Sequence, residues 1–145
     1  MNGRLINPPI FVWGKIIPEK NMRPKSKTKL RSNHSLVANR RRMLQRELDR
    51  WLPLLIEHLK PEQILLFGSL VDKHLGEWSD IDLVIIQQTK LPFYQRIKQV
   101  LKLIRPTVGV DLLIYTPDEF SNLSKERRFF RDEILAKGTV LYARG

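Results

Sequence analysis

Residues 63–86 decide the fold, and they read QILLFGSLVDKHLGEWSDIDLVII. The apolar run Gln63–Phe67 predicts a buried strand, which a Gly-Ser pair ends. A polar stretch over residues 70–78 follows and predicts a short helix and a loop. The segment Ile81–Ile86 is apolar apart from one aspartate and predicts a second strand. A strand, a loop-sized crossover and a second strand therefore form the centre of the predicted domain.

The segment before the first strand carries apolar residues mostly three or four positions apart, beginning just after Ser35. This spacing leaves one apolar stripe and predicts a long helix. Pro53 lies inside the pattern and is expected to kink or restart the helix, because proline lacks the N–H that the helix needs. The stripe consists of Leu36, Met43, Leu44, Leu48, Trp51, Leu52, Leu55, Ile56 and Leu59.

Helices and strands continue to alternate after the second strand. Thr116–Glu119 has the pattern of a helix start, with threonine as N-cap, proline at the first helical position and glutamate at the third. The alternation predicts an α/β (or α+β) fold, a small mixed sheet flanked by helices. The further elements expected are a helix over 92–104, a strand over 110–115, a last helix over 124–136 that stops at Gly138, and a short strand over 139–142.

The net charge of +11 is concentrated in the first third of the chain. Residues 1–50 hold 13 Lys and Arg against 3 Asp and Glu, whereas residues 51–145 hold 13 against 12. We expect residues 1–42 to form a basic, flexible leader and residues 43–145 to form the folded domain. The basic tract, which ends at Arg40–Arg42, favours a solvated tail or a tail docked on an acidic partner; weak, non-specific binding of nucleic acid is the alternative.

An apolar island within the leader, Phe11–Trp13 followed by Ile16 and Ile17, has the composition of a docking segment. It favours packing against a partner or a second copy, so that a homo- or hetero-oligomer is expected. No apolar run approaches the ~20 residues of a membrane span. The N-terminus has no long apolar segment of the kind that a signal peptide needs. A cytoplasmic protein without membrane contact is expected.

The residue types present in the chain exclude several kinds of functional site. The chain has no cysteine, which excludes disulfides, zinc–thiolate sites and cysteine nucleophiles. Its three histidines, His34, His58 and His74, are scattered along the sequence and are expected on the surface.

Three aspartates occupy unusual positions in apolar strands. Asp80 and Asp82 flank Ile81, and residues two apart on a strand point to the same face. Asp111 is the second residue of another apolar strand. If these strands are neighbours, three carboxylates meet at one end of the sheet and disfavour one another's charge. Mg²⁺ removes that repulsion, and two such ions ~3.5–4 Å apart form the metal pair used in phosphoryl and nucleotidyl transfer.

The Gly68-Ser69 pair ends the first strand where a helix is expected to follow. Glycine lets a phosphate approach the backbone, the Ser69 hydroxyl donates a hydrogen bond, and a helix N-terminus offers N–H groups. Each of these motifs also has a purely structural interpretation. Gly-Ser would then be an ordinary turn, Ser79-Asp80 would be a cap, and Asp111 would be a solvated edge residue. Their combination at this spacing favours a phosphate-binding site with metal-binding carboxylates.

Phe67-Gly68-Ser69, ten residues, and then Ser79-Asp80-Ile81-Asp82-Leu83 resembles the signature of the DNA polymerase β-like nucleotidyltransferase superfamily. The size and the C-terminal residues 138–142 are most similar to its minimal nucleotidyltransferase (MNT) branch. The resemblance covers roughly residues 43–142.

The resemblance implies a nucleotidyltransferase fold and a set of site residues. Asp80 and Asp82 would bind two Mg²⁺ ions. Asp111 would help to hold the catalytic ion and would orient or deprotonate an attacking hydroxyl. Gly68 and Ser69 would bind the β- and γ-phosphates of a nucleoside triphosphate, usually ATP.

Members of the MNT branch resemble antitoxins paired with HEPN-type RNase toxins, and they transfer AMP to a tyrosine hydroxyl of the toxin. The resemblance therefore implies an adenylyltransferase antitoxin with a HEPN-type partner. Many members carry arginine directly after the Gly-Ser pair, where this chain has Leu70; Lys73 or His74 would have to substitute. Two alternatives stay open: an antitoxin that neutralises its partner by binding alone, and a nucleic-acid-binding protein with a vestigial site.

Overall fold

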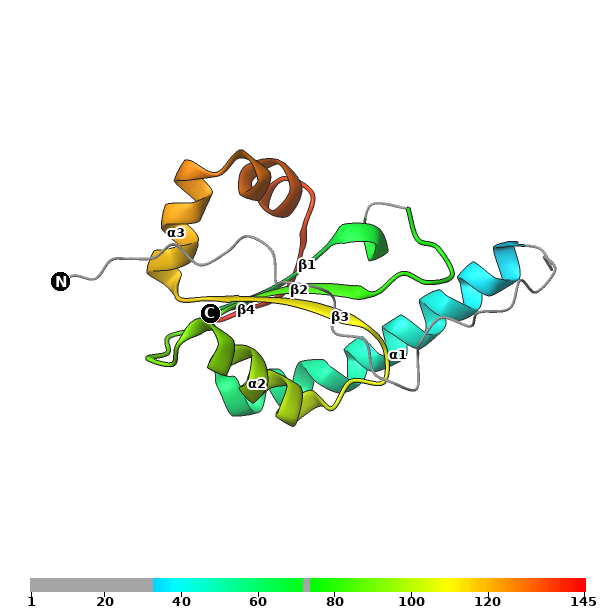
Figure 1. Cartoon of the computed structure of the whole chain (residues 1–145), viewed down its shortest axis with the longest axis horizontal. Coiled ribbons are helices and arrows are strands. Elements are labelled where there is room, and N and C mark those ends of the chain that lie inside the picture. The colour runs from blue at the N-terminus through cyan, green and yellow to red at the C-terminus, as the bar shows by residue number, and fades with distance from the viewer. Residues whose placement is uncertain (1–32, 72–73) are drawn as a thin grey trace.

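The computed structural model describes residues 33–71 and 74–145. Its sheet has four strands in the order β3-β2-β1-β4, and the helices lie on both sides of it (Figure 1). The strands are β1 (Gln63–Phe67), β2 (Ile81–Ile86), β3 (Val110–Tyr115) and β4 (Thr139–Ala143). The helical elements are α1 (Asn33–Leu59), η2 (Gly68–Leu70), α2 (Phe93–Ile104), α3 (Pro117–Glu126) and η3 (Phe130–Leu135). This architecture confirms the predicted α/β class with a small mixed sheet.

Both pairing directions occur in the sheet. β1 pairs antiparallel with β2 and with β4, whereas β2 and β3 run parallel. A parallel pair needs a crossover, and α2 supplies it between β2 and β3. The bounds predicted for the first three strands agree with those observed. The predicted crossover between Ser69 and Asp80 returns the chain beside β1, as expected.

The alternation of side chains along the strands divides the core into two layers. Helices α1 and α2 cover one face of the sheet, and α3 and η3 cover the other (Figure 1). On the central strand β2, Ile81, Leu83 and Ile85 pack toward α1 and α2, whereas Val84 and Ile86 pack toward α3 and η3. Even-numbered positions of β2 therefore belong to the α3 and η3 face.

Helix α1 begins close to its predicted start at Ser35. It is continuous through Pro53, so that of the two predicted effects of this proline, a kink or a restart, the restart does not occur. Pro53 is exposed, so water can satisfy the carbonyl that proline leaves without a donor, while the buried Trp51 and Leu55 hold the helix on the sheet. The helix also includes residues 33–42, which the sequence analysis placed in the leader. The remainder of that predicted leader, residues 1–32 with the apolar island, lies outside the described residues.

The predicted single helix over residues 124–136 is wrong. Helix α3 already begins at Pro117, with the predicted capping box on Thr116, and ends at Glu126. Arg127 has extended backbone angles, and η3 follows after it. The break changes the chain direction so that Leu123 and Phe130 both pack into the same core layer.

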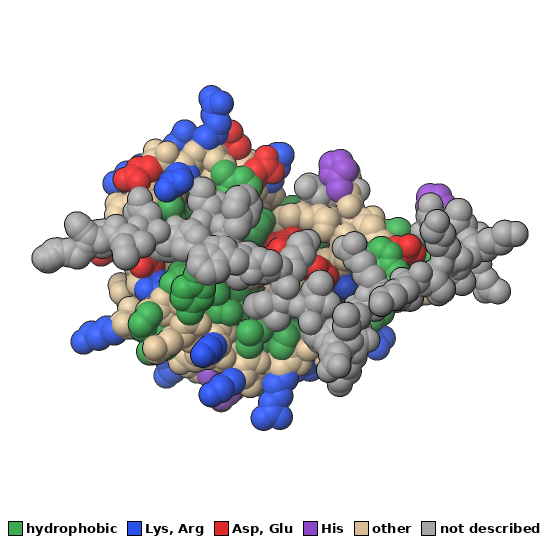
Figure 2. All heavy atoms as spheres, in the orientation of Figure 1, with side chains coloured by type: hydrophobic (Ala, Val, Ile, Leu, Met, Phe, Trp, Pro, Cys, Tyr) green, Lys and Arg blue, Asp and Glu red, His purple; other side chains and the backbone are tan. Residues whose placement is uncertain are grey.

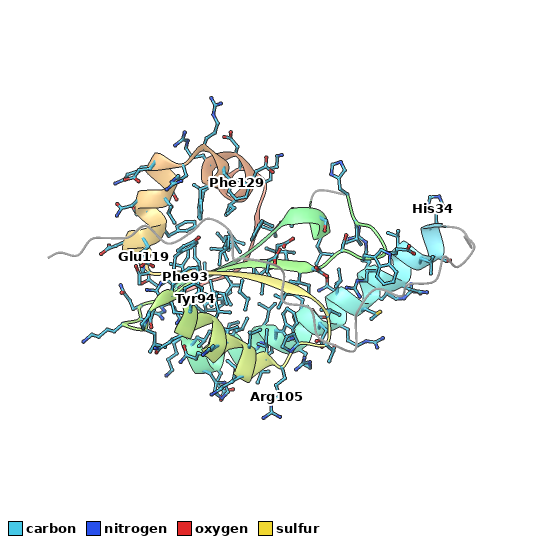
Figure 3. The ribbon with its side chains drawn as sticks, viewed as in Figure 1. His34, Phe93, Tyr94, Arg105, Glu119 and Phe129 are labelled. Atoms are coloured by element: carbon cyan, nitrogen blue, oxygen red, sulfur yellow. The ribbon has the colours of Figure 1, made fainter. Side chains whose placement is uncertain are left out.

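A partly buried ion pair lies at the end of the sheet at which α2 begins. Arg96 of α2 donates to Glu119 at 2.6 Å, and to the carbonyl oxygens of Ile114 at 3.1 Å and Leu91 at 2.8 Å. Glu119 also accepts from the Thr116 N–H at 2.8 Å. Figure 3 shows Phe93 and Glu119 at this end and His34 at the distant tip of α1. These polar groups satisfy one another, so this end of the sheet is structural.

The exposure of the histidines agrees with the sequence prediction, because His34, His58 and His74 all lie on the surface. Among the helices of the described ranges, none is long and apolar enough to span a bilayer.

Candidate functional site

The predicted aspartates meet at the other end of the sheet, where β2 and β3 begin. Asp82 and Asp111 are direct partners in the parallel register, and Phe67, the last residue of β1, faces Asp82. Asp82 lies two residues before Val84, and Asp111 lies two residues before Leu113. Because residues two apart on a strand point to the same face, both carboxylates lie on the α3 and η3 face. Asp80 precedes β2 by one residue and is buried, like Asp82. The structure therefore brings the three predicted carboxylates to one edge of the sheet.

Asp82 lies directly over Gly68. A Cβ atom added at Gly68 would come within 2.9 Å of the Asp82 Cγ, so only glycine leaves room for this carboxylate. Gly68 also has a φ of +78°, a conformation that L side chains rarely adopt. Two local features therefore require glycine at position 68: its positive φ and the close approach of the Asp82 carboxylate.

Asp80 makes an equivalent approach to a second glycine. A Cβ at Gly109 would meet the Asp80 Cγ at 2.6 Å and its Oδ2 at 2.9 Å. Gly109 also accepts a hydrogen bond from the Ile81 N–H at 3.1 Å through its carbonyl. The sequence analysis missed Gly109, although a glycine two residues before the strand aspartate Asp111 was a signal that could have found it.

Arg40 is the second residue that the sequence analysis did not place in the site. It was read as part of a basic tract, but in α1 its side chain is buried. Its Nε donates to the Ser79 carbonyl oxygen at 2.8 Å, and its Nη2 donates to the Asp80 Oδ1 at 3.4 Å. The N-terminal half of α1 extends past the strand ends, which lets Arg40 reach this edge from a helix on the opposite face (Figure 1).

Glu47, one to two turns further along α1, fixes the segment that leads into β3. Its carboxylate accepts from the Thr107 N–H at 2.8 Å and from Arg50 at 2.8 and 2.9 Å. Arg50 also donates to the Arg105 carbonyl oxygen at 3.1 Å. Burial raises the pKa of Glu47, but the hydrogen bonds from Arg50 and Thr107 outweigh burial and lower it to about 2. Helix α1 therefore supports the site through Arg40 and through Glu47.

The short helix predicted after the Gly-Ser pair is a single 3₁₀ turn. It spans Gly68–Leu70 and is closed by the hydrogen bond that the Val71 N–H donates to the Gly68 carbonyl oxygen at 3.0 Å. Leu70 is buried in the core layer that faces α1. Trp78, in the loop before Asp80, is 38% exposed. Lys73, one of the two cations considered as substitutes for the missing arginine, lies outside the described residues, and His74 is exposed.

The donor atoms at this edge suit a hard divalent cation. Carboxylate oxygens are the ligands that Mg²⁺ takes from proteins, and three carboxylates lie near one another here: Asp82 and Asp111 as direct partners, and Asp80 two residues before Asp82. In the described part of the chain, however, no three acidic, histidine or cysteine side chains form a ready-made metal cluster. The carboxylates diverge, with Asp82 over Gly68 and Asp80 over Gly109 beside Arg40. The residues present fit Mg²⁺ in kind, and binding would require Asp80 to turn toward its neighbours.

The surface around the edge is mixed in charge. Figure 2 shows acidic side chains gathered near the centre of this face, between the helices above and below the sheet, while many lysines and arginines project from its rim.

The structure thus combines a mixed sheet with a Gly-Ser turn after β1, an Asp-x-Asp segment at the start of β2 and a third aspartate in parallel register on β3. The family described as "Polymerase beta, Nucleotidyltransferase" matches residues 52–145, and the chain belongs to this family. A solved structure of a proposed nucleotidyltransferase from Sulfolobus solfataricus is similar, with 16% identity, a TM-score of 0.48, and coverage of 82% of this chain and 94% of that chain. No curated protein matches the sequence.

Proposed function

We propose that the protein transfers AMP from ATP to a hydroxyl group of a protein partner, and that this partner is a HEPN-type RNase toxin. The observation that carries the proposal is the register of Asp82 and Asp111 beside the Gly68 turn. Two carboxylates lie side by side next to this turn, which supports a site where divalent cations and a triphosphate would bind together. Family membership supports nucleotidyl transfer, and the resemblance of the size and of residues 138–142 to the MNT branch supports a protein acceptor.

Each site residue has a defined task in this reaction. Asp80, Asp82 and Asp111 would hold two Mg²⁺ ions, which when bound supply positive charge for the triphosphate and the leaving pyrophosphate. Gly68 leaves room for the Asp82 carboxylate beside the turn, and the Ser69 hydroxyl would donate a hydrogen bond to the phosphates.

The transfer step involves one proton acceptor on the protein. Asp111 accepts the proton of the acceptor hydroxyl as the hydroxyl oxygen attacks the α-phosphorus of ATP. The bond between the α-phosphorus and the bridging oxygen breaks, and pyrophosphate leaves. Positioning and electrostatics account for most of the catalysis in such transfers.

The test is label transfer from ATP labelled at the α-phosphate, in the presence of Mg²⁺, to the product of the adjacent gene. A small helical neighbour with an Arg-x4-His motif would have the features of a HEPN partner. We expect label on a tyrosine of that partner with the wild-type protein. Asp82→Asn, which keeps the side-chain shape over Gly68, is expected to lose the transfer by several orders of magnitude. Undiminished transfer by Asp82→Asn would contradict the assigned roles.

A second candidate function is neutralisation by binding alone. Leu70 favours it, because this buried side chain stands where many relatives carry an arginine and cannot balance phosphate charge. A partner that is silenced without ATP and without any covalent label would support this second candidate.

A further inference from the structure

The ion pair between Arg40 and Asp80 is buried on both sides. Relative exposures are 10% for the Arg40 side chain and 7% for that of Asp80. The guanidinium also donates to the Ser79 carbonyl oxygen at 2.8 Å, so its position is set by two acceptors in adjacent residues. Arginine residues of α1 that lie nearby in the sequence, such as Arg41 and Arg46, are exposed. The contact with Asp80 therefore distinguishes Arg40 from the other cations of this helix.

Charge gives this pair a role beyond holding α1 in place. Three carboxylates at one edge of a sheet repel one another, and a positive group beside one of them offsets part of that repulsion. Arg40 supplies such a group to Asp80 in the cation-free protein. A divalent ion bound to Asp80 would supply the same compensation, so that two positively charged groups, the ion and the guanidinium, would compete for one carboxylate.

We propose that Arg40 is a positioning residue that acts through Asp80: it serves as the counter-ion of this carboxylate before metal binds, and it sets the affinity of the site for divalent cations. The inference rests on the proposed function, because it requires that Asp80 bind metal. Coulomb repulsion between the guanidinium and the bound ion weakens metal binding. Removal of the positive charge at residue 40 should therefore destabilise the cation-free protein and tighten its binding of metal.

A purely structural role for Arg40 makes a different prediction. If the side chain only ties α1 to the segment before β2, its loss lowers the stability of the protein and leaves the metal affinity of the folded molecules unchanged. A role in orienting Asp80 toward metal predicts that the affinity falls. The sign of the change in metal affinity thus separates the three roles.

The experiment is a titration of the full-length protein with Mn²⁺ alone, followed by thermal unfolding and by calorimetry. Four proteins are compared: the wild type, Arg40→Gln, Arg40→Lys and Arg46→Gln. Arg40→Gln removes the charge and keeps much of the side-chain volume, whereas Arg40→Lys keeps the charge. Arg46→Gln removes an exposed charge from the same helix and is the matched control.

For Arg40→Gln we expect a lower melting temperature without metal and a half-saturating Mn²⁺ concentration at least about threefold below that of the wild type, because a like charge near a divalent ion weakens its binding and burial reduces the screening. Arg40→Lys and Arg46→Gln should stay within about twofold of the wild type, because the charge is retained in one and is solvated in the other. A half-saturating concentration that is unchanged or higher in Arg40→Gln would overturn the inference.

Two further outcomes are informative. If Arg40→Gln does not fold without metal, Mn²⁺ should restore its folding, since the ion replaces the missing positive charge; failure of Mn²⁺ to do so would overturn the inference. If neither the wild type nor any variant responds to Mn²⁺, the metal site of the proposed function is itself wrong, and the inference falls with it. A normal response in the wild type with no change in Arg40→Gln refutes the inference alone.

Discussion

Replacement of Gly109 by alanine tests the close approach on which the site depends. The new Cβ would lie within 2.6 Å of the Asp80 Cγ, whereas ordinary contacts between such atoms begin near 3.4 Å. Asp80 would have to move by most of an ångström, away from the positions in which Arg40 contacts it. Overpacking of this kind costs about 1–3 kcal/mol of unfolding free energy. In a chain of this size, each kcal/mol lowers Tm by roughly 2–4 °C.

Gly76→Ala is the matched control. A Cβ at Gly76 meets only the Ser79 Oγ at 3.9 Å, which is ordinary van der Waals contact. The assay is thermal unfolding of both variants with and without Mn²⁺. We expect Gly109→Ala to lose Tm and to show a smaller metal-induced rise than the wild type, and Gly76→Ala to stay close to the wild type in both respects. Equal behaviour of the two variants would refute the argument that Asp80 depends on the space above Gly109.

The remaining predictions concern charge. Asp82→Asn should fold at least as well as the wild type without metal, because it removes one of three like charges, but should lose the metal-dependent gain in Tm. Ser69→Ala should reduce label transfer only modestly, because one neutral hydrogen bond contributes about 1 kcal/mol. The pKa of Glu47 is lowered from 4.5 to about 2, so its contribution of up to about 3 kcal/mol is present above pH 4.5 and is lost as the pH falls toward 2. Denaturant unfolding at pH 7 and pH 3 should therefore show a smaller gap between wild type and Glu47→Gln at pH 3; an equal gap at both values would contradict this. Nucleic-acid binding through the basic tract should fall steeply between low and moderate salt, and sequence-selective binding that persists at ~0.2 M salt would refute it.

Local sequence patterns predicted most of the elements that carry the site. The apolar runs of β1, β2 and β3 agree with their observed bounds, and the Thr116 capping box is formed. These elements can be predicted from the sequence because each depends on residues that are close together in the chain. The sequence predicted that the carboxylates meet if their strands are neighbours, but the parallel direction and the pairing of Asp82 with Asp111 are visible only in the structure.

The parts that sequence reasoning missed depend on contacts between distant residues. Arg40 lies 40 residues from Asp80, and Glu47 lies 60 residues from Thr107. Nothing in the local pattern distinguishes Arg40 from Arg41, because both belong to one basic run. Helix α1 also continues across Pro53 because tertiary packing outweighs the local cost of proline, and α3 ends at Glu126 because the core requires a change in direction.

Neutralisation of the HEPN-type partner by wild-type protein and by Asp82→Asn tests the central claim most directly. RNA cleavage by the partner is measured after incubation with each protein, ATP and Mg²⁺, and the partner is then examined for covalently bound AMP. The proposed transferase predicts that the wild type leaves the partner labelled and inactive, while Asp82→Asn leaves it unlabelled and active. Equal silencing by both proteins, with no AMP on the partner, would contradict catalysis as the mechanism.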